Sequence, residues 1–255
     1  MDRYLYPRNF LLWGRIGFCA SRMQDEVEAI LNLPTEPSSA TVGFVGIPAS
    51  IACMDDEKVM EAYRDLTFVS VDGMPIVKKA RKAGLDCERC TGPDTMTLLL
   101  KESTARGMTH YFYGGKDDGV LAKIRSNLER EYPGIRIAGM YSPPFRDLTP
   151  EEDEELCRSI NELHPDMIWV GIGQPRQDLW LAEHREKLHG ALILGVGAAF
   201  DFAAGSLGRA PGFLRKAGLE WLYRFAKEPR RLWKRYIRGG FRYLYYCMKY
   251  PSKRI

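Results

Sequence analysis

Two glycine-rich turns are candidate phosphate-binding sites, because each leads from a short apolar run, an expected strand, into an expected helix. Gly114 and Gly115 come directly after the run from His110 to Tyr113 and precede a helical pattern that starts near Asp117. Backbone N–H groups in such a turn can face an anion at the N-terminus of the helix. An ordinary strand-to-helix turn explains the same residues, since Asp117 and Asp118 would complement the helix dipole. The sequence leaves these two interpretations open.

The second turn, from Gly171 to Gln177, offers side chains as well as backbone donors. Gly171 and Gly173 leave an apolar run, and Arg176 and two glutamine amides, including that of Gln177, follow at once. Arginine can bind a phosphate through two N–H groups, and an amide can hydrogen-bond a uracil or sugar edge. This turn is therefore the stronger candidate for a binding site.

Two aspartates could act in catalysis or merely cap a helix, and the first follows an expected strand directly. Asp72 follows the apolar residues Phe68 to Val71, and a carboxylate at this edge of a sheet can accept a proton from a substrate hydroxyl. The alternative is that Asp72 caps a helix that starts near Pro75. Asp201, which follows the glycine-rich segment Gly195 to Phe200, is open to the same two interpretations.

Several common catalytic motifs do not occur in the sequence. Cys87 and Cys90 form a CxxC pair without a second pair or a suitably spaced histidine, so we interpret them as two ordinary thiols. The four histidines form no HxxxH or HExxH pattern, and no serine lies in a GxSxG turn. Metallohydrolase and serine-hydrolase functions therefore have no support in the sequence, and we predict no cofactor. A nucleotide-dependent oxidoreductase, which is one alternative function, lacks its usual GxGxxG motif.

Short apolar runs alternate with amphipathic helical patterns along most of the chain. Strands are predicted over residues 41–45, 68–71, 110–113, 135–140, 167–172 and 192–196. Helices are expected over 56–63, 117–131 and 177–188, and another begins after the N-cap Thr149. Strands separated by such helices favour parallel pairing through right-handed crossovers. The prediction is an α/β fold with flanking helices, whose ligands bind beyond the carboxyl ends of the strands.

Charge is distributed unevenly along the 255 residues, which carry a formal net charge of +4. Residues 209–255 have a balance of +12 and hold 11 of the 29 aromatic side chains, whereas residues 1–208 carry −8. We therefore divide the chain into a core of residues 1–208 and a C-terminal segment of residues 209–255.

A basic and aromatic helical segment of this kind can lie on an anionic membrane surface or bind a nucleic acid. A nucleic-acid-binding protein is the second alternative function, but the sequence contains no recognisable nucleic-acid module. The membrane surface is the partner we expect, and nucleic acid is not.

The composition, with 45% hydrophobic and 27% charged residues, is that of a folded protein. No apolar stretch approaches the roughly 18 residues that a spanning helix needs. Arg3, Arg8 and Arg15 interrupt the apolar residues near the N-terminus, which argues against a signal peptide. Six scattered cysteines do not suggest a disulfide scaffold. We expect a cytoplasmic location, and the sequence leaves open whether the chain forms a homo-oligomer.

A series of motifs in a fixed order resembles the WecG/TagA/CpsF family of bacterial glycosyltransferases over about Ser21 to Tyr250. The motifs occupy Val71–Pro75, Arg89–Asp94, Tyr111–Gly115, Tyr141–Arg146, Val170–Asp178, Gly195–Phe202, Arg209–Pro211, Gly218–Arg224 and Glu228–Leu232. The resemblance implies a Rossmann-like core of the GT-E type. It also implies transfer of a sugar from a UDP-sugar to a polyprenyl-diphosphate-linked saccharide, with inversion at the anomeric carbon.

The resemblance also implies roles for individual residues. Asp72 matches the proposed catalytic base of the family, and Arg89 and Gln177 match positions of its substrate pocket; no metal is implied. We assign donor binding to the two glycine-rich turns and Asp201, namely to Gly114, Gly115, Gly171, Gly173, Arg176, Gln177 and Asp201.

The C-terminal segment would bring the protein to the cytoplasmic face of the bacterial plasma membrane as a peripheral protein. There Arg224 and Arg231, together with Arg89, would bind the lipid diphosphate of the acceptor. Lys234 stands where some relatives carry a third arginine, and we add the neighbouring Arg235 to this group.

One departure from the family pattern concerns the donor sugar. Many members carry a threonine and an asparagine after the strand that precedes Asp72, whereas this sequence reads Phe44 to Ser50 there without that pair. N-acetylmannosamine and its uronic acid therefore cannot be carried over from the family as the donor sugar of this chain. Glucose, glucuronic acid or another hexose remains open as the donor sugar.

Overall fold

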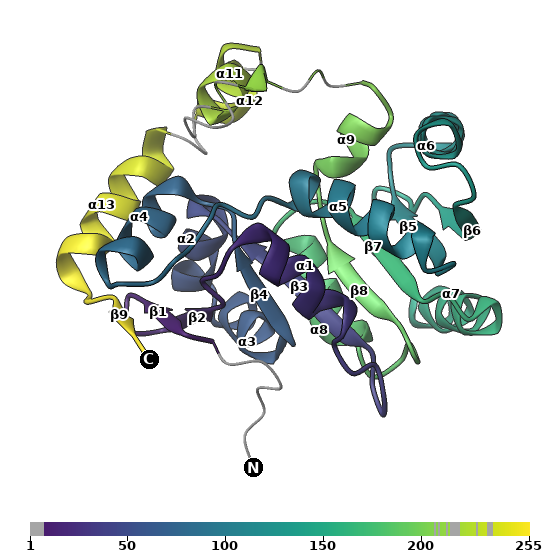
Figure 1. Cartoon of the computed structure of the whole chain (residues 1–255), viewed down its shortest axis with the longest axis horizontal. Helices are drawn as coiled ribbons and strands as arrows, with labels where there is room; N and C mark the ends of the chain where they lie inside the picture. The colour runs from purple at the N-terminus through teal and green to yellow at the C-terminus, as the bar shows by residue number, and fades with distance from the viewer. Residues whose placement is uncertain are drawn as a thin grey trace.

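The computed structural model of the chain describes residues 8–206, 208, 210–212, 214, 220–227, 229–233 and 237–255, apart from the side chains of residues 224, 231 and 232. The described residues form a six-stranded parallel sheet in the order β4-β3-β8-β7-β5-β6 (Figure 1). Its strands are β3 (Ala40–Val45), β4 (Phe68–Val71), β5 (Thr109–Gly114), β6 (Arg136–Tyr141), β7 (Met167–Gly171) and β8 (Leu192–Gly195). The predicted Rossmann-like α/β fold is confirmed, and each predicted strand is present with small differences at its ends.

The two edge strands of the sheet differ in burial. β4 is buried although it lies at an edge, where the N–H of Cys19 donates to the carbonyl of Val69 at 2.8 Å. All residues of β3, β4 and β8 are buried, because both faces of these strands are covered. This is why they read in the sequence as nearly continuous apolar runs. β6 lies at the edge of the sheet and is exposed at both ends.

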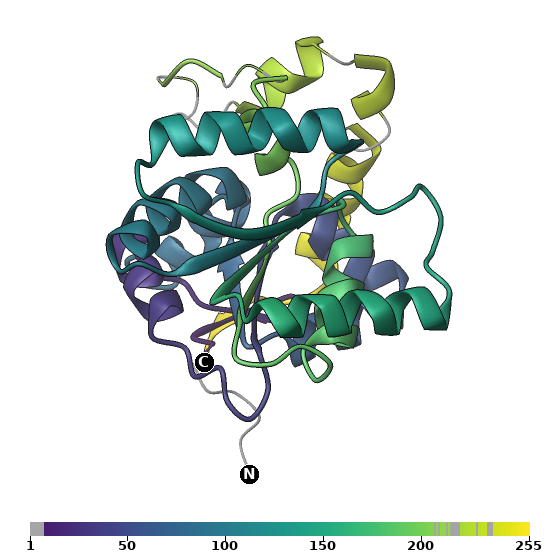
Figure 2. The same ribbon diagram turned by 90° about the vertical axis from the view of Figure 1, so that its right-hand side faces the viewer.

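Two layers of helices cover the sheet, each with its own core of buried side chains. One core joins α1 (Met23–Leu31), α5 (Gly92–Ala105), α6 (Asp118–Glu131) and α9 (Ala199–Ala203) to one face. The other joins α2 (Ile47–Asp55), α3 (Glu57–Asp65), α4 (Met74–Lys82), α7 (Pro150–Leu163) and α8 (Arg176–His184) to the opposite face. Figure 2 shows the twisted sheet between these layers.

The helix start predicted at Thr149 is confirmed by its hydrogen bonds. The Thr149 hydroxyl accepts from the N–H of Glu152 at 3.3 Å, and the Glu152 carboxylate accepts from the N–H of Thr149 at 2.9 Å. This reciprocal pair is a capping box, and Pro150 occupies the first turn, where no N–H partner is needed. α7 ends at Leu163, and its C-cap His164 adopts a left-handed conformation with φ 44° before Pro165.

A small antiparallel sheet joins the two ends of the described chain, an arrangement that our sequence analysis missed. β1 (Phe10–Leu12) pairs with β2 (Ile16–Phe18) and with β9 (Lys253–Arg254). In the turn between β1 and β2, Trp13 is 1% exposed. Its ring packs against Tyr243 and Tyr246, with centroids 5.3 and 5.1 Å away.

Those tyrosines belong to the last helix of the C-terminal segment. The segment contains α11 (Glu220–Lys227), α12 (Pro229–Trp233) and α13 (Gly239–Lys249). α13 packs against α2, and Arg242 donates to both carboxylate oxygens of Asp55 at the end of α2. The domain boundary at residue 209 stays a prediction, but the described end of the segment is integrated into the core.

None of the helices within the described residues combines the length and the apolar character that crossing a bilayer requires.

Candidate active site

A cavity of about 330 Å³ lies at the carboxyl edge of the parallel sheet. Five of the residues that line it lie at the ends of strands or directly after them: Phe44 (β3), Asp72 (β4), Gly115 (β5), Gly171 (β7) and Gly195 (β8). The volume falls within the range of small-molecule sites. Parallel α/β sheets bind their ligands at this edge, so the cavity is the candidate active site.

Asp72 lines this cavity and does not cap the helix that follows it. Its N–H donates to the carbonyl of Val45 at 3.0 Å, which continues the pairing of β4 with β3. α4 begins at Met74 with Gly73 as its N-cap, and no side-chain hydrogen bond caps it. The capping interpretation of Asp72 is therefore wrong, and its role toward a ligand stays a prediction.

Asp201 lies within the short helix α9 and also lines the cavity. The N-cap of α9 is Ala198, without a side-chain cap, so Asp201 does not cap this helix. Its backbone carbonyl accepts from the N–H of Ser206 at 3.1 Å, and this bond closes the end of α9.

Gly114 and Gly115 play different structural roles. Gly114 has φ +146°, and a Cβ placed there would lie 2.8 to 2.9 Å from the backbone of Gly171 on the neighbouring strand. Gly114 therefore permits a close approach of β5 and β7. Gly115 lines the cavity, but Asp117 accepts from the N–H of Val120 at 2.8 Å and so satisfies part of the helix N-terminus. The phosphate-binding role of this turn stays a prediction.

The turn from Gly171 to Gln177 is fixed against the neighbouring strand by Gln174. Its Nε2 donates to the carbonyl of Phe44 at 2.9 Å and to the hydroxyl of Tyr63 at 3.1 Å. Gly171 and Gly173 line the cavity, and φ +85° at Gly173 is a conformation that glycine adopts without strain.

Gln177 presents an acceptor that no described residue uses. Its side chain is 1% exposed, and its Nε2 donates to the carbonyl of Gly195 at 2.7 Å. Its Oε1 is buried without a hydrogen-bond partner among the described residues. Because buried polar atoms are generally paired, this oxygen is suited to accept from a hydroxyl or N–H of a bound ligand.

Two cations accompany the two carboxylates of the cavity. Arg176 donates to the carbonyl of Arg146 at 2.8 Å and pairs with Asp147 at 3.1 Å, so it lies at the rim. Lys116 also lines the cavity, and our sequence analysis missed it. Its position directly after a glycine pair at a strand end was the available signal. Phe145, 88% exposed, adds an aromatic ring to the rim from a motif to which we had assigned no role.

The residues predicted to bind the acceptor diphosphate either do not line the cavity or have side chains outside the described structure. Arg89 pairs with Glu220 at 3.3 Å and is not among the residues that line the cavity. Arg224 and Arg231 belong to α11 and α12, and their side chains lie outside the described structure, as does the whole of Arg235. Their roles stay predictions.

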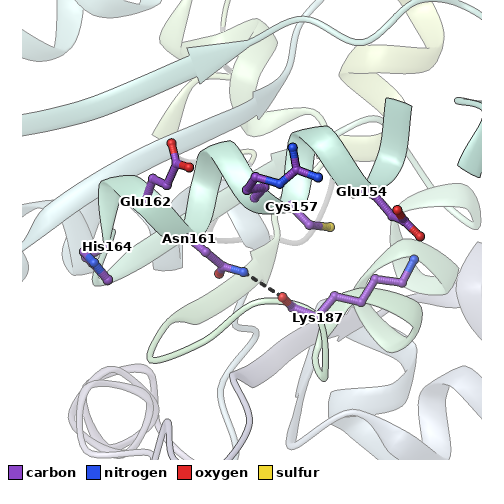
Figure 3. Close-up of a pocket in the computed structure, with 7 residues that line it drawn as sticks. Glu154, Cys157, Asn161, Glu162, His164 and Lys187 are labelled. Carbon is purple, nitrogen blue, oxygen red and sulfur yellow. Dashed lines mark hydrogen bonds between the residues drawn. The ribbon is translucent and has the colours of Figure 1, made fainter. Parts of the chain in front are cut away.

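A second cavity, of about 510 Å³, lies along α7 beside Lys187 (Figure 3). Near it, ligand atoms of Asp153, Cys157 and His184 lie within 4.8 Å of one another, a spacing that could hold a metal ion. The Asp153 carboxylate contacts His184 Nε2 at 2.7 Å and Lys187 Nζ at 2.5 Å, so an ammonium already supplies a cation there. His184 lies eight residues from Arg176 along α8, which is about 12 Å along the helix axis.

A buried carboxyl group lies behind the strand that carries Asp72. Glu26 of α1 is fully buried and accepts a short hydrogen bond from the hydroxyl of Ser70, two residues before Asp72. Burial raises the pKa of Glu26 to about 8, so it is neutral in slightly acidic solution. Burial also raises the pKa of the Cys87 thiol to about 12 and that of Cys90 further, which agrees with two unreactive thiols.

Comparisons with known proteins agree with the motifs. Residues 14–255 match the family model described as "Glycosyl transferase WecG/TagA/CpsF family". The chain is 31% identical over 171 residues to the N-acetylglucosaminyldiphosphoundecaprenol N-acetyl-beta-D-mannosaminyltransferase of Bacillus spizizenii, over 67% of this chain and 64% of the relative. It is 29% identical over 199 residues to the protein of that name from Bacillus subtilis, over 78% of this chain and 75% of the relative. The chain thus spans slightly less than two thirds of the first relative.

Proposed function

Because the chain belongs to the glycosyl transferase WecG/TagA/CpsF family, we propose that it is an inverting glycosyltransferase of bacterial polysaccharide synthesis. It would move a hexose-type sugar from a UDP-sugar to a saccharide carried on a polyprenyl diphosphate. The two relatives are named for an acceptor of this kind, N-acetylglucosaminyldiphosphoundecaprenol. The donor sugar stays open, since residues 44–50 lack the threonine and asparagine of many family members.

The observation that carries this proposal is the position of Asp72 in the cavity. Its carboxylate lies at the carboxyl end of β4 and does not cap α4. In the proposed reaction an acceptor hydroxyl attacks the anomeric carbon, its proton passes to Asp72, and the bond from that carbon to UDP breaks. Attack from the face opposite UDP gives inversion. General base catalysis of this kind contributes roughly 100- to 10,000-fold to a rate.

The other lining residues suit the binding of UDP. Lys116 and Arg176 can compensate the negative charge that develops on the departing diphosphate. The unpaired Oε1 of Gln177 can accept from a sugar hydroxyl or from the uracil N–H. We propose that these side chains perform the charge stabilisation without a metal ion, and transfer is then expected to continue in the presence of EDTA.

The C-terminal segment has a surface suited to a membrane. Phe241, Leu244 and Met248 lie on one face of α13 at spacings of three and four residues, and they are 72%, 59% and 82% exposed. The opposite face of α13 packs on the core through Tyr243 and Tyr246. Exposed cations lie at both ends of α13 and in β9, namely Arg238, Lys249, Lys253 and Arg254. We propose that this face docks the protein on the anionic cytoplasmic surface of the plasma membrane.

The test of the catalytic proposal is transfer of radiolabelled sugar from a panel of UDP-sugars into a lipid-extractable product. Asp72→Asn is expected to lower the transfer rate at least 100-fold without a change in thermal unfolding. Asp86→Asn, which alters an exposed carboxylate paired with Arg22, serves as the matched control. Equal transfer by the wild type and Asp72→Asn would remove Asp72 from the role of base. Absence of transfer from every UDP-sugar would contradict the donor class.

A further inference from the structure

One ion pair connects the start of α11 with the part of the core next to Asp72. Glu220, the first residue of α11, pairs with Arg89 at 3.3 Å. Both side chains are mostly buried, with 11% of Glu220 and 15% of Arg89 exposed. The second carboxylate oxygen of Glu220 is also buried, without a hydrogen-bond donor in the described part of the chain. The contact is therefore unlike the exposed ion pairs of the surface, which contribute little.

The backbone around Arg89 is fixed to the strand that carries Asp72. The N–H of Cys90 donates to the carbonyl of Val71 at 2.8 Å, and Val71 directly precedes Asp72. On the other side of Arg89, the N–H of Glu88 donates to the carbonyl of Ser21 at 2.9 Å. Arg89 is thus held on both sides, and a partner of its guanidinium is positioned relative to the end of β4.

Burying the Arg89–Glu220 ion pair costs free energy, and a role in positioning would explain why the protein nevertheless contains it. Removing two charges from water is expensive, and a buried ion pair seldom adds to stability compared with apolar side chains. The best-attested benefit of such a pair is a defined arrangement of the elements that carry it. Here the elements are the core and α11, whose described packing is mainly against α12 rather than the sheet.

We infer that Glu220 is a positioning residue that holds the C-terminal segment over the active-site edge by binding Arg89. This inference rests on the proposed transferase function. It also revises the role expected for Arg89, because a diphosphate at this guanidinium would meet the Glu220 carboxylate. Arg89 then acts on the acceptor through the placement of α11.

Exchanging the two charges separates these roles. Arg89→Glu and Glu220→Arg, made singly, place like charges together and are each expected to lower kcat/KM for the lipid acceptor at least tenfold. The Arg89→Glu/Glu220→Arg double variant restores the opposite pair and is expected to recover most of that loss. If Arg89 instead bound the acceptor diphosphate, the double variant would stay as impaired as Arg89→Glu, and the inference would be wrong.

A second readout does not depend on transfer activity. Limited trypsin digestion reports whether α11 is held, since Arg224 and Lys227 lie within it. The single variants are expected to be cut at these residues at least tenfold faster than the wild type, and the double variant at nearly the wild-type rate. Unchanged digestion of the single variants would overturn the inference even if the protein had another activity. If no sugar is transferred but the single variants are still digested faster than the double variant, only the proposed transferase function is contradicted.

Neutral variants cover the case in which the exchanged pair does not fold. Arg89→Gln, Glu220→Gln and the double Gln variant form a cycle in which removing either partner breaks the same contact. The double variant is then expected to be no more impaired in KM for the acceptor than either single variant. Additive losses would mean that the two residues act independently, which contradicts the inference. Glu228→Gln in the same segment is the matched control.

Discussion

The active-site cavity and the C-terminal segment are positioned by contacts of very different range. Asp72, Gly115 and Gly171 reach the cavity because each lies at or next to the end of a strand in one parallel sheet. α13, in contrast, is held by Asp55, 187 positions away from Arg242, and by Trp13 near the other end of the chain. The comparison teaches that each candidate residue of the cavity is placed by a local pattern, the end of a strand, whereas the attachment of the proposed membrane surface depends on side-chain packing between distant segments.

The largest effect is expected where that long-range packing is broken. Trp13→Ala removes a ring that is 1% exposed and packs against Tyr243 and Tyr246. The free energy of unfolding is expected to fall by about 3 to 5 kcal/mol. Chemical denaturation measures this change. Trp233→Ala, at a tryptophan 56% exposed, is the control and is expected to change stability by less than about 0.5 kcal/mol. Similar losses in both variants would show that the small sheet does not anchor α13.

A smaller effect is expected from changing the outward face of α13 without touching its anchored face. The triple variant Phe241→Ser, Leu244→Ser and Met248→Ser removes exposed apolar side chains and keeps every charge. Its partition onto vesicles that contain anionic lipid is expected to fall at least tenfold, because a buried apolar side chain contributes about 1.5 to 3 kcal/mol. Co-sedimentation measures the bound fraction. Leu163→Ser, at an exposed leucine of α7, should leave binding unchanged. Undiminished binding of the triple variant would count against this face as the membrane contact.

The smallest effect concerns the support of the active-site strand by Glu26. In the folded protein its pKa is raised to about 8, whereas in the unfolded chain it stays near 4.5. The unfolded state therefore binds fewer protons between these values, and stability falls as the pH rises through this interval. Glu26→Gln removes this titration. The decrease of the unfolding free energy with rising pH is therefore expected to be less steep, by up to about 1.4 kcal/mol per pH unit.

Urea unfolding at pH 5.5 and pH 7.5 measures that slope. Glu28→Gln, on the same helix but exposed, is the matched control and should keep the wild-type slope. Equal slopes in the wild type and Glu26→Gln would mean that Glu26 ionises in the folded protein at its ordinary pKa.

Much of the core could be predicted because its patterns are local. Buried strands read as apolar runs, and Thr149 with Pro150 and Glu152 specifies a helix start through contacts within four residues. The roles of Asp72 and Asp201 could not be decided in the same way. A capping aspartate and a ligand-binding aspartate look alike in sequence, and the helix starts at Met74 and Ala199 exclude only the capping role.

Lys116 and the pairing of Arg89 with Glu220 escaped the sequence analysis for a related reason. The position of Lys116 after a glycine pair was only a weak signal, and it became a candidate when the strand ends converged on one cavity. Arg89 and Glu220 are 131 positions apart, so no periodicity links them.

The sequence by itself determined the family, the parallel α/β core and the aspartate and glycines at the strand ends. These features depend on the period of apolar residues and on turns of a few residues, which the chain encodes without reference to distant parts. Only the tertiary structure decided which of these side chains share a cavity and that the two ends of the chain form one small sheet. It also decided that Glu220 meets Arg89. Such contacts arise from the packing of elements far apart in the chain, and their geometry exists only once the whole core has formed.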